Sequence, residues 1–479
     1  MPRKPISPQR DLSALYHLER ADPRPLYVQL ADQLERAIRD GALGPGERLP
    51  SARSLAAALS TTPVTVHQAF QRLRSRGLAA SRVGSGTYVA GSRPAAAASA
   101  GLAAHVSLDR REPPAALFPA DVIRQIMDRI LDDEGGEAFA YGDPGGDRDL
   151  KEVLSGDLVE AGFGLSGRDL VVFSGAQQAL SLLFRAHLQR GDWVVVERPT
   201  YPGVLRLLQQ AGARVEAVDV GPDGPDPERL AQVLDMRPVR LVYSLPVYHN
   251  PTGLCWSVEC KRRVAELCAA RGVVLVEDDA LSGVDFGHGR PRALAACAPA
   301  CRNVVYVRSF SMILMPGFRL GYCLAPRELA NTLKRAKEEA DLLTSGFFQR
   351  VLCRFISEGH MRRHLTLIEP YYRDLFAQAT AAAAAILAPA GFTLTPGVGG
   401  PSLWGRLPEG VPGGLFGRHC IREGVGVVPG ESYSLDQSTA DGVGLAFSRL
   451  HPEAWEEGLR RVARAADAAR REARAGQAG

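Results

Sequence analysis

The chain has 479 residues, which is enough for about two to four domains of ordinary size. Hydrophobic residues make up 46% of the sequence and charged residues 23%, a balance that is ordinary for a globular protein and excludes disorder along the whole chain. No run of about 18 apolar residues lacks a charged or polar break, and no apolar segment follows the basic N-terminus. We therefore expect no membrane span, no secretory leader and a cytoplasmic location.

The net charge of +4 is unevenly distributed. Residues 1–95 hold fourteen Lys and Arg against seven Asp and Glu, and residues 48–95 hold seven Arg and no acid. A block with one sign of charge favours a polyanion such as DNA, although a solvated basic face would have the same composition. The eight cysteines, from Cys255 to Cys420, have spacings that match no zinc pattern, so we expect reduced thiols and no metal site.

Changes in composition along the chain predict five parts. Small residues broken by Pro, Gly and Ser at 92–104 are typical of a linker between domains. The predicted parts are a tail at 1–23, a helical unit at 24–91, a linker at 92–114, a large domain at 115–365 and a small lobe at 366–479.

The helical unit predicts three helices. Leucine or isoleucine recurs every four residues from Leu26 to Ile38, a second helix begins at Ser51, and a third begins after Thr62, a plausible N-cap, with Pro63 at its first position. Val66, Ala69, Phe70 and Leu73 of the third helix would face the core. Its outward residues would then be Thr65, His67, Gln68 and Arg72, which suits a helix that reads base edges.

A short hairpin is predicted at 81–89, with glycines at its turn. The turn residues could lie beside a phosphate or in the minor groove: Gly84, Ser85 and Gly86.

Residues 46–89 resemble a GntR-type winged helix-turn-helix, with LPSxR, TVxxA and GxGTxV in the right order. The resemblance implies that Arg48 and Arg53 bind phosphate or guanine of double-stranded DNA. It also implies that Thr62, Thr65 and Gln68 lie in the major groove. Pro63 departs from the family, which usually has arginine there, so we expect a different operator. A helical module that binds a protein instead is the alternative.

From residue 115, β-branched runs alternate with amphipathic stretches, which predicts a mainly parallel α/β sheet covered on both faces. The expected strands are 170–173, 192–197, 240–245, 272–279 and 303–310. Ligands of such sheets bind beyond the carboxyl ends of the strands. After about residue 366 a helix and mixed strands indicate a smaller α+β lobe.

Five segments resemble fold-type I pyridoxal-phosphate (PLP) aminotransferases, in the order of that family. They are SGAQQAL (174–180), ERPTYPG (197–203), YHNPTG (248–253), VEDDA (276–280) and SFSMILMPGFRLGY (309–322). The resemblance implies that Tyr201 stacks on the pyridine ring, that Asn250 binds its phenolic oxygen and that Asp278 pairs with its nitrogen. The phosphate would be bound by Gly175, Ala176, Gln177, Ser309, Ser311 and Arg319.

A GntR reader before an aminotransferase body resembles the MocR-type transcription regulators of bacteria. That resemblance implies a homodimer with its clefts at the subunit interface, in which each reader crosses head to tail over the partner's body. It also implies paired DNA half-sites and a small-molecule effector.

Three positions depart from the aminotransferase pattern. Met312 stands where the family has the Schiff-base lysine, and a thioether cannot form that covalent bond. Ala280 stands where MocR proteins usually have a tyrosine, and Gly444 where the family has the arginine that binds the substrate carboxylate. Arg449 is a candidate replacement for that arginine. We therefore predict no catalytic residue at this site.

Lysine is scarce, with five in the chain, and none of them lies in a matching motif. Lys334 and Lys337 are nearest in sequence, and their charged stretch KRAKEEAD predicts solvated side chains.

Three functions remain open. The first is a DNA-binding transcription regulator with a catalytically inactive body that binds PLP or an unknown ligand noncovalently. The second is a working PLP-dependent aminotransferase with an added DNA-binding domain. The third is a ligand-independent DNA-binding dimer whose body sets the spacing of two readers.

Overall fold

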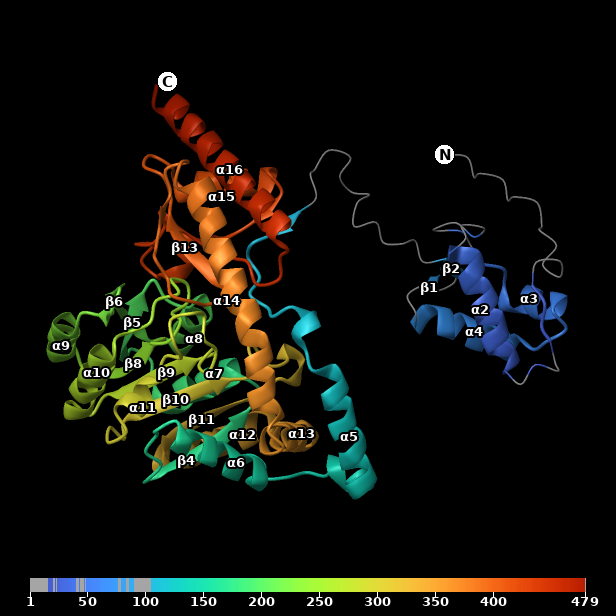
Figure 1. Cartoon of the computed structure of the whole chain (residues 1–479), viewed down its shortest axis with the longest axis horizontal. Helices are drawn as coiled ribbons and strands as arrows, with labels where there is room; N and C mark the ends of the chain where they lie inside the picture. The colour runs from blue at the N-terminus through green and yellow to red at the C-terminus, as the bar shows by residue number, and fades with distance from the viewer. Residues whose placement is uncertain are drawn as a thin grey trace. The chain divides into compact units, whose positions relative to one another are not determined.

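The computed structural model describes residues 16–19, 22, 24–39, 43, 47, 49–75, 79–82, 86–89 and 105–478. They belong to two compact units, Met1–Gly101 and Leu102–Gly479 (Figure 1).

The described residues of the first unit form the helices α2 (Leu26–Arg39), α3 (Ala52–Ala58) and α4 (Pro63–Ser75), where the sequence predicted helices. The four core residues expected on α4 are all buried, each with at most 2% of its surface exposed, and they pack against Leu30 and Leu34 of α2. The backbone N–H of Thr65 donates to the Thr62 hydroxyl at 3.2 Å, which confirms Thr62 as the N-terminal cap. This core fixes which side of α4 faces solvent.

The predicted hairpin is present as strands β1 (Ala79–Arg82) and β2 (Gly86–Val89), which pair antiparallel. The first strand begins two residues before the predicted start. The backbone N–H of Leu49 donates to the Thr87 carbonyl at 2.9 Å, and that of Val89 donates to the Glu47 carbonyl at 2.8 Å. The hairpin is therefore joined to the segment that leads into α3.

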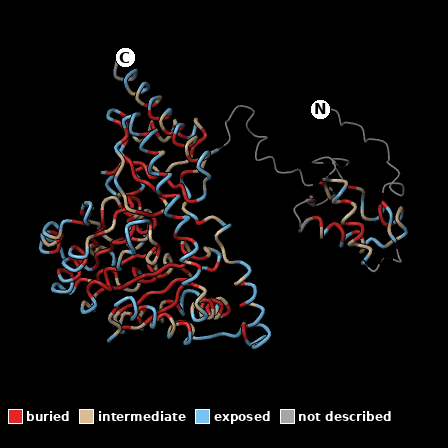
Figure 2. The backbone as a smooth tube through the Cα atoms, in the orientation of Figure 1, coloured by how far each residue is buried: buried red, intermediate tan, exposed pale blue. Residues whose placement is uncertain are grey.

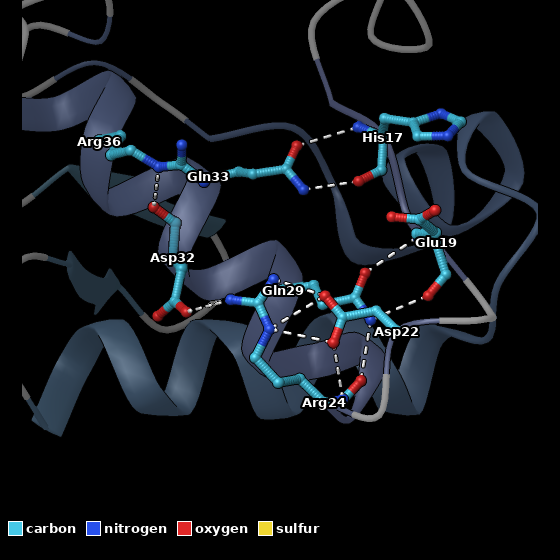
Figure 3. Close-up of polar contacts among 8 residues, drawn as sticks. All are labelled: His17, Glu19, Asp22, Arg24, Gln29, Asp32, Gln33 and Arg36. Carbon is cyan, nitrogen blue, oxygen red and sulfur yellow. Dashed lines mark hydrogen bonds and ion pairs between the residues drawn. The ribbon is translucent and has the colours of Figure 1, made fainter.

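Two glutamines of α2 bind the chain that precedes the helix (Figure 3). Gln33 Nε2 donates to the His17 carbonyl at 2.5 Å while its Oε1 accepts from the His17 N–H at 2.9 Å. Gln29 makes the same paired contact with Glu19, at 3.0 and 2.9 Å. Tyr16 is 6% exposed in the core of the unit. Residues 16–19, which we expected in a tail, are therefore packed onto α2.

An eight-stranded sheet forms the centre of the second unit. Its strands are β4 (Arg168–Phe173), β5 (Trp193–Arg198), β6 (Arg214–Gly221), β7 (Gly224–Pro225), β8 (Val239–Ser244), β9 (Val274–Asp279), β10 (Val304–Ser309) and β11 (Gly321–Pro326). The order is β4-β11-β10-β9-β8-β5-β6-β7, and neighbours are parallel from β10 to β6. The five predicted strands and the mainly parallel α/β fold are confirmed.

Apolar side chains alternate between the two faces of this sheet. On β10, Val304 and Tyr306 belong to one hydrophobic cluster, whereas Val305 and Val307 belong to another. The second cluster is shared with α7 (Ala176–His187), α8 (Pro202–Ala211) and α12 (Arg327–Asp341). The first includes residues of α5 (Ala120–Glu134), α6 (Arg148–Glu160), α10 (Val258–Ala270), α11 (Leu294–Cys297) and α13 (Gly346–Ser357). Figure 2 shows the resulting buried layer along the strands. Helix α9 (Pro227–Met236) packs near the β6 edge.

The small lobe is reached through α14 (His360–Leu387), a long helix that runs along the large domain into the lobe (Figure 1). A four-stranded sheet, of order β12-β13-β16-β15, forms the lobe. The elements of the lobe after α14 are β12 (Thr393–Leu394), β13 (Ser402–Arg406), α15 (Gly413–Arg422), β14 (Val425–Gly426), β15 (Val428–Pro429), β16 (Gly442–Ala446) and α16 (Pro452–Ala478).

Part of the segment that we assigned to the linker belongs to this lobe. Strand β3 (Val106–Ser107) pairs in parallel with β14, and the N–H of Ala446 donates to the carbonyl of the fully buried Leu108 at 2.7 Å. The sequence did not predict this strand because β3 is only two residues long and directly follows an alanine-rich stretch. The chain after Leu108 is thereby held at the edge of the lobe.

Within the described residues, no helix is long and apolar enough to cross a membrane. The same residues contain no group of three or more His, Cys, Asp and Glu side chains that could hold a metal ion. All eight cysteines are free thiols.

Candidate functional site

The first unit presents polar side chains on α4. His67 and Gln68 are exposed, as is Thr62 at the start of the helix, whereas Thr65 and Arg72 are half-buried. Thr65 is turned back to the cap, because its hydroxyl is 3.0 Å from that of Thr62. If α4 reads bases, His67 and Gln68 are therefore better placed than Thr65 to contact them.

The other residues expected to bind DNA are described only in part. Arg53 is exposed on α3, and the N-terminus of that helix is capped by Ser51, whose hydroxyl accepts from the Ser54 N–H at 3.1 Å. Gly86 begins β2 and pairs with Arg82. Arg48, Gly84 and Ser85 lie outside the described residues.

The second unit contains a cavity of about 340 Å³ at the carboxyl ends of the parallel strands. That is where a parallel α/β sheet is expected to bind ligands. Segments that follow β4, β5, β8, β9 and β10 contribute to its wall, and Gly399, Gly400, Pro401 and Ser402 close it from the small lobe. Eight of the nine residues that we assigned to the cofactor line it: Ala176, Gln177, Tyr201, Asn250, Asp278, Ser309, Ser311 and Arg319.

The ninth, Gly175, does not line the cavity but lies against Arg319, which does. It precedes α7 with a φ of +93°, and a Cβ at this position would stand 2.7 Å from Arg319 Nη2. That nitrogen donates to the Ser174 carbonyl at 2.9 Å. The free N–H groups at the start of α7 and the Arg319 guanidinium therefore meet at one place, which favours a phosphate there.

The middle of the cavity is acidic. Asp278 is 8% exposed, and its Oδ2 accepts a hydrogen bond from the Tyr243 hydroxyl at 2.7 Å. Burial raises the pKa of the Asp278 carboxyl to about 6, although the Tyr243 hydrogen bond opposes that shift. The neighbouring Asp279 forms a buried ion pair with Arg308 at 2.7 Å. This pair joins the ends of β9 and β10 and so positions Asp278 and Ser309.

Two further side chains complete the wall. The Tyr201 hydroxyl donates to Gln177 Oε1 at 3.2 Å, and burial raises its pKa. Asn250 lines the cavity with a buried Oδ1 that has no hydrogen-bond partner among the residues that the structure describes. Because a buried amide oxygen without a partner is costly, Asn250 is suited to a polar ligand group.

Met312 and Ala280 also line the cavity, and none of the lysines in the described part of the chain does. Lys334 pairs with Asp169 at 2.9 Å. The solvated position expected for Lys337 is wrong, because its side chain is fully buried and pairs with Asp341 at 2.8 Å. Burial lowers the Lys337 pKa, and the Asp341 pair opposes this. The alternation of charge in its helix did not reveal that one face of α12 packs on the sheet.

The cavity also contains a basic residue that was not predicted from the sequence. Arg111, from the segment once assigned to the linker, lines it and donates to the hydroxyl of Tyr433. Arg449 pairs instead with Glu112 at 2.7 Å and does not line the cavity. Gly444 lies on β16, where the Tyr433 hydroxyl occupies the place of a side chain. The only feature of the sequence that could have pointed to a basic residue at this site is the adjacent pair Arg110 and Arg111.

Known proteins resemble both units. Residues 115–440 match the family model for aminotransferase class I and II, and residues 26–89 match that for bacterial regulatory proteins of the gntR family. A 2-aminoadipate transaminase of Thermus thermophilus is 32% identical over 352 residues, which cover 73% of this chain and 87% of the relative. The HTH-type transcriptional regulator YdcR of Escherichia coli is 28% identical over 464 residues, covering 91% and 96%.

A solved structure is similar to the second unit. It is LysN, the α-aminoadipate aminotransferase of Thermus thermophilus, complexed with N-(5'-phosphopyridoxyl)-L-leucine. The TM-score is 0.70 at 28% identity, over 76% of this chain and 92% of LysN.

Proposed function

Because the chain belongs to the class I and II aminotransferase family and carries a gntR-family DNA-binding domain, as MocR-type regulators do, we propose that its body senses a ligand without transamination. The observation that carries this proposal is Met312, which lines the cavity among phosphate-binding and ring-binding residues while no lysine does. Binding of the ligand would then change how the reader domains engage DNA.

The DNA part of this proposal is tested by salt and by two substitutions. Binding should weaken steeply as salt rises, because neutralised phosphates release counterions. Arg53→Ala should weaken binding to all sequences and reduce the salt slope by about 1. Gln68→Ala should instead relax preference at one base pair, by about 1–3 kcal/mol. Fluorescence anisotropy with operator and scrambled duplexes measures both effects.

The matched control is Arg124→Ala, since Arg124 is an arginine of α5 whose side chain is 67% exposed. It should leave the affinity and its salt slope unchanged. An affinity of the unmodified protein that hardly responds to salt would contradict the recognition model.

The aminotransferase fold family normally binds PLP, and the residues of this cavity fit its noncovalent binding. The unpartnered Asn250 Oδ1 and the cradle at Gly175 and Arg319 support that fit. Asp278 would face the ring nitrogen, and Tyr201 the ring. When bound, PLP supplies an electron-withdrawing ring. Met312 offers no amine to bond with its aldehyde, so these residues would bind and orient the ligand only.

Ligand binding should depend on pH through Asp278. The pKa of its carboxyl is about 6, so the carboxylate that would attract a protonated ring nitrogen is lost below that pH. We expect the affinity for PLP to fall as pH decreases from 7.5 to 5, approaching about tenfold per pH unit from this group. The ligand phosphate also titrates near pH 6. Asp278→Asn separates the two effects, because only the phosphate contribution should remain; identical pH profiles would refute the role of Asp278.

We also propose a homodimer that presents two readers to paired half-sites. Aminotransferase-like folds are typically dimeric, and C2 pairing is the commonest closure. Two aromatic side chains that follow α5 support a subunit interface there, because Phe139 is 66% and Tyr141 is 86% exposed in the single chain and a partner subunit would cover them. The head-to-tail crossing of the readers belongs to this proposal.

A working aminotransferase is the second candidate, and the 32% identity to a transaminase favours it. The absence of lysine among the residues that line the cavity weighs against it. A ligand-independent DNA-binding dimer remains the third, and it predicts that PLP leaves both the absorbance spectrum and the DNA affinity unchanged.

A further inference from the structure

Arg111 places a positive charge in the cavity that no acidic residue neutralises. It is half-buried, it lines the cavity, and it forms no ion pair within the part of the chain that the structure describes. Its Nε is buried and makes no hydrogen bond there. A guanidinium keeps its charge at any ordinary pH, and removing it from water is costly unless an anion compensates. This side chain is therefore incomplete without a further partner.

Tyr433 holds Arg111 in place. The tyrosine is fully buried and packs edge-on against Trp404, with ring centroids 5.0 Å apart. Its backbone carbonyl accepts a hydrogen bond from the Thr200 N–H at 3.0 Å. Its hydroxyl accepts from Arg111 Nη2, and the guanidinium carbon lies 5.8 Å from the centroid of its ring. The orientation of Arg111 is thus fixed by a rigid part of the lobe.

The two basic groups of the cavity come from separate segments. Arg319 meets the N-terminus of α7, whereas Arg111 follows β3 and is bound to the small lobe. Asp278 lines the same cavity and comes from a third segment, at the end of β9. Asp109 also lines the cavity, but it is exposed and accepts a hydrogen bond from the Ser107 hydroxyl. This set of charges suits a ligand with two anionic groups and a cationic ring.

We propose that Arg111, oriented by Tyr433, binds a carboxylate of the ligand, while Arg319 and the start of α7 bind its phosphate. The ligand class is then a phosphopyridoxyl compound that also bears a carboxylate, such as a phosphopyridoxyl amino acid. This inference rests on the proposed function, because it takes the cavity to be a phosphopyridoxyl site. Arg111 determines specificity here and takes no part in bond making.

Two probes that differ only by a carboxylate test the proposal on the full chain. They are N-(5'-phosphopyridoxyl)-L-leucine and N-(5'-phosphopyridoxyl)-3-methylbutylamine, and isothermal titration calorimetry gives both affinities. The unmodified protein should prefer the leucine compound by about ten- to a hundredfold, the usual contribution of a charged hydrogen-bonded pair. Arg111→Ala should abolish this preference, because it should lower the affinity for the leucine compound about ten- to a hundredfold more than the affinity for the amine compound.

Three further variants separate binding from folding. Arg111→Lys should keep part of the preference, since it retains the charge and loses the planar fork. Tyr433→Phe keeps the buried ring and should lower the preference several-fold. Arg449→Ala is the matched control, because Arg449 is paired with Glu112 outside the cavity, and it should keep the full preference.

The outcomes distinguish this inference from the function on which it rests. If the amine compound binds but the carboxylate adds nothing, or if Arg111→Ala keeps the preference, Arg111 is not the carboxylate site and the proposed ligand-sensing cavity stands. If neither compound binds the unmodified protein, the phosphopyridoxyl site is wrong and the inference falls with it.

Discussion

Met312→Lys is expected to form about one covalent pyridoxyl adduct per chain, whereas we expect the unmodified protein to form none. The side chain at 312 lines the cavity together with Asn250, Asp278 and Arg319, so a phosphate-anchored aldehyde would meet the new amine. Burial should lower the pKa of that amine toward its neutral, nucleophilic form. Borohydride reduction followed by peptide mass spectrometry measures the adduct and its position.

The variant should still transaminate poorly. Gly444 has no side chain to hold a substrate, and Ala280 has no hydroxyl to support the ring oxygen. Met312→Gln, of similar length without a basic amine, is the matched control and should form no adduct. A specific adduct on one lysine of the unmodified protein would contradict the inactive site, because that lysine would then serve as the anchor.

Phe70→Ala is expected to destabilise the first unit, and so to weaken DNA binding, while leaving the second unit intact. Phe70 is 2% exposed in the core of the first unit, and deleting such a ring costs about 3–5 kcal/mol. A domain of this size has a stability of only about 5–15 kcal/mol, so much of the margin is lost. The second unit has its own hydrophobic clusters. Calorimetry should therefore show one transition shifted to lower temperature and the other unchanged.

Val64→Ala provides the control on the same helix. Val64 is 65% exposed, and a change there should alter stability by about 0.5 kcal/mol or less and leave DNA affinity nearly unchanged. If the first unit of Phe70→Ala were unfolded by calorimetry and the variant still bound DNA as tightly as the unmodified protein, that unit would not be the part that reads DNA.

The fold could be predicted well from the sequence because its signals are local and repeated. Continuous apolar runs marked the central strands, and the spacing of Val66, Ala69, Phe70 and Leu73 marked the core face of α4. The extent of each domain was harder. Leu108 joins the lobe through a partner, Ala446, that is distant in sequence, and no local pattern reveals such a pairing.

Only the cavity residues that follow a local sequence signal could be predicted. Residues at strand ends, such as Asp278 and Ser309, follow apolar runs and could be found by position. Arg111 could not, because the residue that orients it, Tyr433, is 322 positions away. The burial of Lys337 depends likewise on how α12 lies against the sheet, which the charge pattern of one helix does not specify.

The packing of Tyr433 over Gly444 restricts how this site can change over evolutionary time. Gly444→Arg alone would drive a side chain into the space that the Tyr433 hydroxyl holds, and the ring cannot withdraw easily because Trp404 packs against it. An arginine at position 444 of β16 would therefore need a smaller residue at 433 as well, and that second change would release Arg111. Gly444→Arg and a smaller residue at 433 are each unfavourable without the other. An intermediate with only the change at 433 would have no arginine at 444 and no Tyr433 to orient Arg111. The two ways of placing a positive charge in the cavity are therefore separated by a form that has neither.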